Sequence, residues 1–230
     1  MNKLILFTVV TLLLFSNCKS TYEFRSPNDV NRTDCTLYLI DGTLKTGKIT
    51  IQFEKEANID HSSGIHLITA EGADEAIPFN IILYYKIKDD LYFPKRFDLS
   101  DGIDLPYNSI HNLYLSDQRN YLFVKLVTKP DSKILLFELY LPANNSSDGL
   151  EHYKYFVSLP NHDSYEVWYI GGTHFFPNFG EKMSALVSDC TTLAQKIKNK
   201  EKGYYFTHSS FEYKWLEVFK RIIEEYNNCK

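Results

Sequence analysis

The spacing of hydrophobic and polar residues divides the chain into three stretches. Residues 4–15 form a largely apolar run that follows a single cation, Lys3. Over residues 35–172, apolar and polar residues alternate in short segments, which is the period of β-strands. Over residues 173–230, apolar residues recur at the spacing of α-helices. The pattern predicts an α+β fold: an antiparallel β-barrel or sandwich-like sheet, followed by a small carboxy-terminal helical subdomain packed on the sheet.

A hairpin begins the β-rich stretch. Strand-like segments at Thr36–Ile40 and Lys48–Phe53 lie on either side of Asp41-Gly42, a dipeptide typical of tight turns. Further strand-like segments recur about every 10–15 residues without helices between them, so we expect antiparallel pairing. Pro78 lacks the N–H that a strand ladder needs, which predicts that its segment is an edge strand or begins a strand.

The carboxy-terminal stretch predicts two helical regions and a disulfide. One apolar stripe runs from Phe179 to Ile197, with a break at Ser188-Asp189, and a second begins near Ser210. Cys190 lies on the first stripe and Cys229 follows the end of the second, so packed helices would bring the two thiols together. A loop of about 40 residues closed in this way adds roughly 3–4 kcal/mol to stability. The alternative is a pair of reduced, buried thiols.

The amino terminus has the layout of a secretory signal. Its apolar core follows a cation and is shorter than the roughly 20 residues that a membrane-spanning helix needs. The residues after it, Phe15-Ser16-Asn17-Cys18, resemble the lipobox of bacterial lipoproteins. That resemblance implies a signal peptide over residues 1–17, a lipid on Cys18, and a lipidated tether over residues 18–34. The alternative is cleavage by an ordinary signal peptidase, which would leave a soluble secreted protein.

The residues around Cys18 predict the membrane at which a lipidated protein would be held. The tightest form of the motif has Leu three places before the Cys and Gly or Ala directly before it, where this chain has Phe15 and Asn17. Lys19 is not the Asp that retains lipoproteins at the inner membrane in the best-studied bacteria. We therefore expect a protein held at the outer membrane through the lipid on Cys18, because two or more acyl chains bind a bilayer almost permanently.

Charge and cysteine count narrow the choice of partners. The formal net charge is −4 and becomes −5 when Lys3 leaves with the signal, so binding to nucleic acid is not expected. If Cys18 carries lipid and Cys190 pairs with Cys229, Cys35 remains as a free thiol, which we expect to be a small buried hydrophobe. Disulfides persist in oxidising compartments, in agreement with export.

The sequence holds no complete catalytic, cofactor or metal motif. HExxH, paired CxxC and phosphate-binding glycine loops are missing from it. His61 and His66, with Asp60 and Glu71, are interpreted as loop residues rather than metal ligands. Asn161-His162-Asp163-Ser164 is interpreted as a turn, since a catalytic triad is assembled from distant segments. Gly171–Pro177 is interpreted as the crossover from sheet to helix, with a ligand lip as the alternative. We therefore assign no catalytic, cofactor or metal residue.

The carboxy-terminal quarter resembles a known group of proteins. Its sequence Ser188-Asp189-Cys190, Lys196-Ile197 and Tyr226-Asn227-Asn228-Cys229 is similar to the Asp-Cys, Lys-Ile and Tyr-Asn-x-Cys signature of uncharacterised secreted proteins and lipoproteins of Bacteroidota. Many of them carry Pro after the Asp-Cys, where this chain has Thr191. The resemblance implies a β-rich body with an α-helical tail and no established activity.

These observations predict a non-catalytic envelope lipoprotein whose β-rich domain binds an envelope protein or a glycan, or has a structural role. The alternative is an envelope hydrolase with unrecognised catalytic residues. An enzyme needs at least two titratable groups that converge in one cleft, for example His162, His174 and a carboxylate. A binding protein instead presents polar and aromatic residues over a surface.

Overall fold

A computed structural model describes residues 23–27, 29–52, 64–97, 121–141, 152–159, 166–172, 174–206 and 212–229. The predicted signal peptide and Cys18 lie outside these ranges, as do Asp60, His61 and the segment 161–164. The strands are β1 (Glu23–Ser26), β2 (Asp29–Leu39), β3 (Leu44–Gln52), β4 (Gly64–Ile68), β5 (Asp74–Pro78), β6 (Ile82–Ile87), β7 (Asp90–Phe97), β8 (Tyr121–Leu126), β9 (Leu135–Leu141), β10 (His152–Ser158) and β11 (Glu166–Tyr169). The described helices are the 3-10 helix η1 (Phe79–Ile81) and the α-helices α3 (Phe179–Leu186), α4 (Thr191–Lys198) and α5 (Glu212–Asn228).

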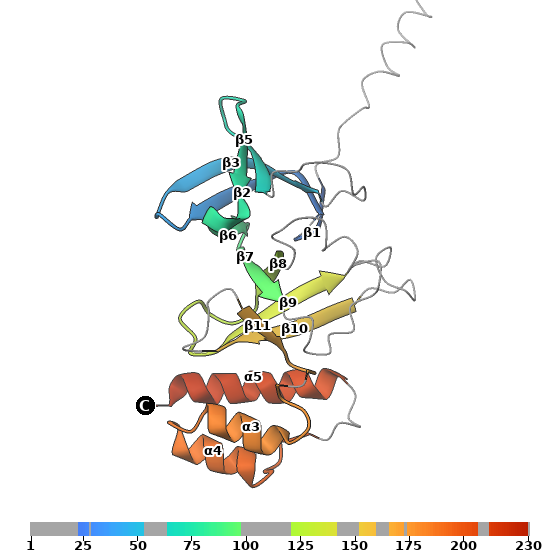
Figure 1. Cartoon of the computed structure of the whole chain (residues 1–230), viewed down its shortest axis with the longest axis vertical. Helices are drawn as coiled ribbons and strands as arrows, with labels where there is room; N and C mark the ends of the chain where they lie inside the picture. Colours follow the sequence, from blue (N-terminus) through green and yellow to red (C-terminus); the bar gives the residue numbers. More distant parts are fainter. Residues whose placement is uncertain are drawn as a thin grey trace, which may run out of the picture.

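One sheet connects all of the described strands. Its order is β11-β10-β9-β8-β7-β6-β2-β3-β4-β5, with β1 paired to β2. The predicted hairpin is confirmed as β2 and β3, whose turn holds Gly42 at φ +85° while the Thr43 N–H donates to Asp41 Oδ1 at 2.8 Å. β5 ends at Pro78 and lies at the end of the strand order, so the predicted edge position is also confirmed. Figure 1 shows this amino-terminal sheet, β1 to β6, at one end of the molecule.

Strand pairing starts earlier than the sequence predicts. β1 and the first part of β2 lie within residues 18–34, where we expected a tether. From Glu23 onward, this segment therefore pairs with the sheet. Val30 is fully buried, and the Tyr85 hydroxyl donates to the Pro27 carbonyl at 2.7 Å. The polar side chains of this segment do not mark it as a strand, because backbone pairing and one buried valine are what hold it.

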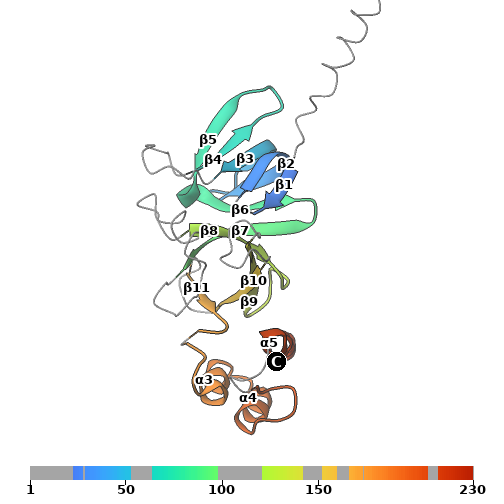
Figure 2. The same cartoon turned by 90° about the vertical axis from the view of Figure 1, so that its right-hand side faces the viewer.

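The second half of the sheet closes on itself. β11 pairs antiparallel with β10 and also pairs parallel with β7, through Glu166 opposite Arg96 and Val167 opposite Phe97. Strands β7 to β11 therefore form a ring, which Figure 2 shows from one end, whereas the sheet as a whole is not closed. The α+β prediction is confirmed, although this one pairing is parallel. It is parallel because the ring has five strands: when neighbours alternate in direction, the first strand, β7, and the fifth, β11, run the same way.

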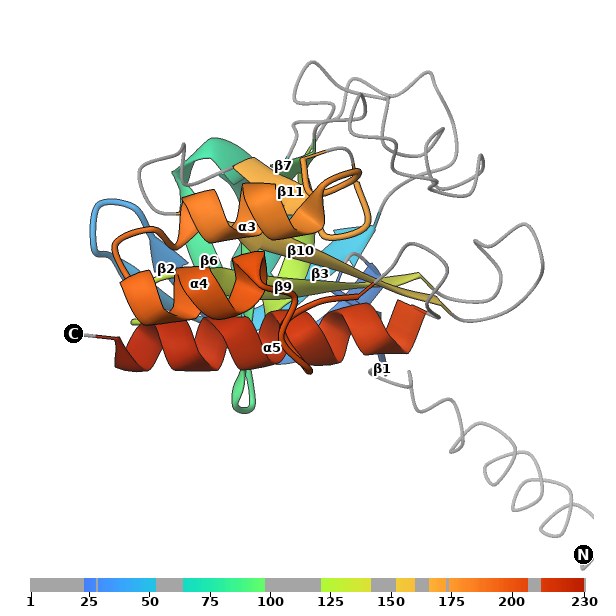
Figure 3. The ribbon, with the colours of Figure 1, turned by 90° about the horizontal axis from the view of Figure 1, so that it is seen from below.

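The helical subdomain packs on the outside of the ring. Its core joins Leu136 of β9 and Val157 of β10 to Phe179 of α3, Leu193 of α4 and Phe219 of α5, all of them buried. Figure 3 shows α5 beside α3 and α4, with β9 and β10 behind them. Because each helix presents one apolar face, stacking on the ring removes all three faces from water. No helix among the described residues is long and apolar enough to cross a membrane.

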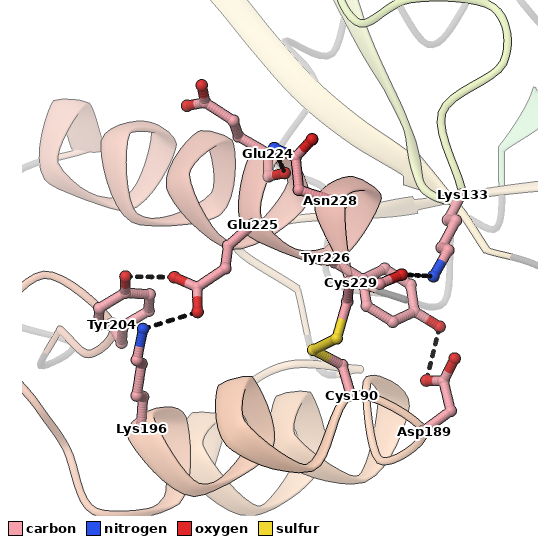
Figure 4. Close-up of a disulfide and its surroundings, with 10 residues drawn as sticks. All are labelled: Lys133, Asp189, Cys190, Lys196, Tyr204, Glu224, Glu225, Tyr226, Asn228 and Cys229. Carbon is pink, nitrogen blue, oxygen red and sulfur yellow. Dashed lines mark hydrogen bonds and ion pairs between the residues drawn. A yellow bond between two sulfur atoms is a disulfide. The ribbon is translucent and has the colours of Figure 1, made fainter.

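The break between α3 and α4 falls where the sequence predicts it, and the predicted disulfide forms there. Cys190 bonds to Cys229 with a Cα–Cα distance of 5.9 Å (Figure 4). Asp189 caps no helix; instead it accepts a hydrogen bond of 2.8 Å from the Tyr226 hydroxyl. Burial and this contact with Asp189 raise the pKa of Tyr226 to about 12, so the phenol remains a donor at neutral pH.

The segment after β11 is the predicted crossover to the helices. Phe175 is buried in the core beneath the helices, and Phe176 packs against the same core. The His174 ring stacks on Trp168 with centroids 4.3 Å apart. The aromatic residues of this crossover therefore serve packing rather than a ligand lip.

Removing the disulfide is expected to lower the free energy of unfolding by about 3–4 kcal/mol, because the bond closes a long loop in the unfolded chain. The variant is Cys190→Ala with Cys229→Ala, measured by urea denaturation. Cys35→Ala is the control, since Cys35 is buried and unbridged, with an expected loss of about 1 kcal/mol. Equal losses in the two variants would contradict a stabilising bridge.

Candidate functional site

A row of polar and aromatic residues crosses five strands in register. Successive cross-strand partners are Tyr85 of β6, Tyr92 of β7, Lys125 of β8, Glu138 of β9 and Tyr155 of β10. Residues directly opposite each other in antiparallel strands share one face of the sheet. On β7 to β10 the alternate positions face the ring interior. Most are apolar, including Phe93, Val124, Phe137 and Phe156, and the buried Lys95 lies over the Phe93 and Phe137 rings. The row therefore runs along the outer face.

A pocket of about 260 Å³ lies on this outer face. It is lined by Pro27, Asp90, Tyr92, Lys125, Glu138, Tyr140 and Tyr153. Pro27 comes from the turn after β1, so that turn contributes one wall of the pocket and the ring contributes the rest. The hydrogen bond from Tyr85 to Pro27 positions that wall. The pocket thus forms where the two halves of the sheet meet.

Charged groups within the pocket hold one another in place. Lys125 Nζ lies 2.9 Å from Asp90 Oδ1, and Glu138 accepts a hydrogen bond of 3.0 Å from the Tyr155 hydroxyl. The lining carries one cation and two carboxylates, a formal charge of −1. The side chains of Lys125 and Asp90 are 35% and 45% exposed, so both remain within reach of a ligand.

Tyr92 provides a neutral hydroxyl at the base of the pocket. Burial, reinforced by the negative charge of Asp90, raises its pKa well above the usual value for tyrosine. Its hydroxyl lies 3.4 Å from Asp90 Oδ2. Because the phenol stays protonated at neutral pH, it acts as a hydrogen-bond donor and not as a nucleophile.

Two further tyrosines supply aromatic surface. Tyr140 and Tyr153 are cross-strand partners with ring centroids 5.2 Å apart, and Tyr153 is 46% exposed. Tyrosine offers a rigid apolar ring with a polar tip, which is why it is enriched in binding surfaces. The pocket therefore combines aromatic faces with donors and acceptors, the usual composition of a ligand site.

The residues singled out from the sequence lie away from this pocket. His66 lies on β4 and pairs with Asp74 at 3.1 Å, while Glu71 lies on the turn between β4 and β5. No group of three or more metal-ligating side chains occurs among the residues that the structure describes. His174 stacks on Trp168 in the crossover, and His162 lies outside the described ranges. The described residues therefore form no cleft that contains both histidines.

Sequence reasoning missed the pocket, although it carries a signal. Lys125 and Glu138 are each the single charged residue in a strand that is otherwise almost wholly apolar, YLFVKL and LLFELYL. A charge at one position of such a strand indicates that this position faces away from the core. The register that brings the two charges opposite each other cannot be read from the sequence, and neither can Pro27 above them.

Comparisons with known proteins add no relative. No protein-family model matches the chain, and no curated protein or solved structure is significantly similar to it.

Cys35 is buried in the amino-terminal sheet, as the sequence predicts. Burial, together with the neighbouring charge of Asp34, raises its pKa to about 12. Its folded pKa lies above the unfolded value, so native Cys35 stays a thiol at pH 8 and contributes stability that falls as the pH rises above about 9 towards 12. The thiol is therefore unsuited to nucleophilic chemistry at neutral pH.

We expect Cys35 to resist modification until the protein unfolds. In the chain from Lys19 to Lys230, which lacks Cys18, Ellman's reagent at pH 8 should detect almost no thiol in native protein and one thiol after denaturation without reductant. The Cys35→Ala variant should detect none in either state. Rapid labelling of the native protein would show that the thiol is accessible and ionised, contrary to the burial.

Proposed function

We propose that this chain is a bacterial envelope lipoprotein, anchored through a lipid on Cys18, whose β-rich domain binds an envelope protein or glycan without catalysis. The observation that carries the binding proposal is the tyrosine-lined pocket, with Tyr92, Lys125 and Glu138 in one row. The proposed location is the outer membrane. Anchoring there would place the pocket among envelope components rather than cytosolic ones.

The disulfide supports export. Cys190 and Cys229 are joined across the last helical region, and such bonds persist in oxidising compartments. The amino-terminal sequence offers a route to such a compartment through its signal-like run and Cys18. A chain that left the cytosol as a lipoprotein would keep Cys18 for the lipid and Cys35 as a buried thiol, which agrees with the pairing of the other two cysteines.

Binding is favoured over hydrolysis by the state of the pocket residues. Asp90 and Glu138 are two titratable groups in one pocket, which is the minimum that a hydrolase requires. Each is already engaged, Asp90 by Lys125 and Glu138 by Tyr155. The described lining contains neither histidine nor serine nor cysteine. Aromatic rings with paired donors and acceptors suit recognition of a polar ligand better than proton transfer.

Lipidation has a direct test. Cells fed radiolabelled palmitate are expected to label the wild-type protein and not the Cys18→Ser variant, because the thiol is the site of lipid attachment. Cys35→Ala serves as the matched control and should label like wild type. Label that persists in Cys18→Ser would sink the lipoprotein proposal.

Binding through the pocket is tested by removing its most exposed ring. The Tyr153→Ala variant of the chain Lys19–Lys230 is expected to recover at least about tenfold less of the partner captured from envelope extract, since buried tyrosine anchors dominate many interfaces. Leu83→Ala is the control, because Leu83 is 45% exposed, close to the exposure of Tyr153, and lies outside the pocket. Equal recovery by all three proteins would place the binding surface elsewhere.

A further inference from the structure

A second cavity, which we call the lysine groove, lies on the amino-terminal sheet. Its volume is about 720 Å³, and it shares no lining residue with the tyrosine-lined pocket. It is lined by Asp34, Cys35, Thr36, Tyr38, Thr46, Gly47, Lys48, Ile68, Thr69, Ala70, Lys86 and Lys88. Strands β2, β3 and β6 supply most of this lining, and the segment after Leu67 completes one wall. The groove is therefore built on the sheet rather than on a loop.

Strand register gathers the three lysines. Lys86 of β6 is the cross-strand partner of Thr36, which in turn is the partner of Thr46. Lys88 lies in the turn after β6, with φ +54°, and lines the same groove. Lys48 lies opposite Asp34 on the neighbouring pair of strands. Cations from β3 and from β6 with its turn therefore border one concave surface.

The charge of this surface is opposite to that of the whole protein. The lining holds three lysines and one aspartate, a formal charge of +2, whereas the chain as a whole carries −4. Asp34 is 89% exposed and lies 3.9 Å from Lys48. Asp89 follows Lys88 and Glu71 follows Ala70, and both border the groove without lining it. The balance at the lining favours an anion.

Hydroxyl groups in the groove add neutral donors. Thr36 and Thr46 lie in register with Lys86, and Tyr38 lies two residues further along β2; each hydroxyl can donate to an anionic oxygen. Ammonium groups with nearby hydroxyls are the chemistry that binds phosphate esters. A phosphate could come from a lipid headgroup or from a soluble compound. The proposed lipid anchor on Cys18, which would hold the groove near a bilayer, favours the lipid headgroup.

The predicted anchor enters the fold next to the groove. Glu23 of β1 pairs with Asn31, and Asp34 at the groove lies three residues further along β2, about 10 Å away. Glu23 lies five residue steps after Cys18, a distance of at most about 18 Å. With the roughly 5 Å between the paired strands, a lipid on Cys18 would keep the groove within about 33 Å of the bilayer surface.

We propose that the lysine groove binds the phosphate headgroup of anionic phospholipids at the surface of the membrane to which the protein is tethered. This inference rests on the proposed envelope anchoring for its location and on the groove itself for its chemistry. Each lysine at such a surface strengthens attachment about fivefold, over a range limited by salt screening. The groove would add a second, headgroup-specific contact to the lipid anchor.

The test uses the chain Lys19–Lys230, which contains every described residue but neither the signal nor Cys18. It is sedimented with phosphatidylcholine vesicles, with or without about 30% phosphatidylglycerol, at low salt. The groove variant is Lys48→Gln, Lys86→Gln and Lys88→Gln. The control variant is Lys198→Gln, Lys214→Gln and Lys220→Gln, which changes the net charge equally at exposed positions of the helical subdomain. Circular dichroism verifies that both variants fold.

The wild type and the control variant are expected to bind the phosphatidylglycerol vesicles, and the groove variant to bind about a hundredfold more weakly. Equal weakening in the two variants would mean that net charge alone attracts the protein, which overturns the proposal. Binding of inorganic phosphate without vesicle binding, or no binding at all, also overturns it. Because this chain lacks Cys18, the result is independent of whether palmitate labels the full protein.

Discussion

The buried phenol of Tyr85 connects the parts of this molecule. Its ring stacks on Tyr92 with centroids 4.8 Å apart and meets the edge of Phe123, while its hydroxyl donates to the Pro27 carbonyl. It therefore joins β6 to the ring and to the turn after β1 at the same time. A buried hydroxyl without a partner is costly, so the position of Pro27 is fixed by the need to satisfy this donor. The tyrosine-lined pocket exists because that turn is held there.

On the side of the ring away from the amino-terminal sheet, a different set of interactions holds the helical subdomain in place. Apolar residues of β9 and β10 form one core with the three helices, and the disulfide ties the start of α4 to the end of α5. Polar contacts connect the same elements. Lys196 of α4 pairs with Glu225 of α5 at 2.7 Å, and Lys133, before β9, donates to the Cys229 carbonyl at 2.8 Å. The carboxy terminus is thereby fastened both to the helices and to the sheet.

The sequence predicted those elements whose signal is local. The Asp41-Gly42 hairpin, the edge strand at Pro78 and the Cys190–Cys229 pair depend on turn chemistry or on one apolar stripe, and all three occur in the structure. Strand β1 and the first part of β2 escaped prediction because backbone pairing and one tertiary contact hold them. Both cavities escaped for a related reason: they depend on register between strands, and a shift of one residue would send Lys125 or Lys86 to the opposite face.

The continuous sheet links the two cavities mechanically. The lysine groove lies on the amino-terminal sheet and the tyrosine-lined pocket lies where that sheet meets the ring, with strand pairing unbroken between them. Figures 1 and 2 show the amino-terminal sheet and the helical subdomain at opposite ends of the long axis. If the amino-terminal sheet rests on a bilayer, the helices must extend away from it, because the ring between them is tied to both. Orientation at the membrane would then determine the height at which the pocket meets its ligand.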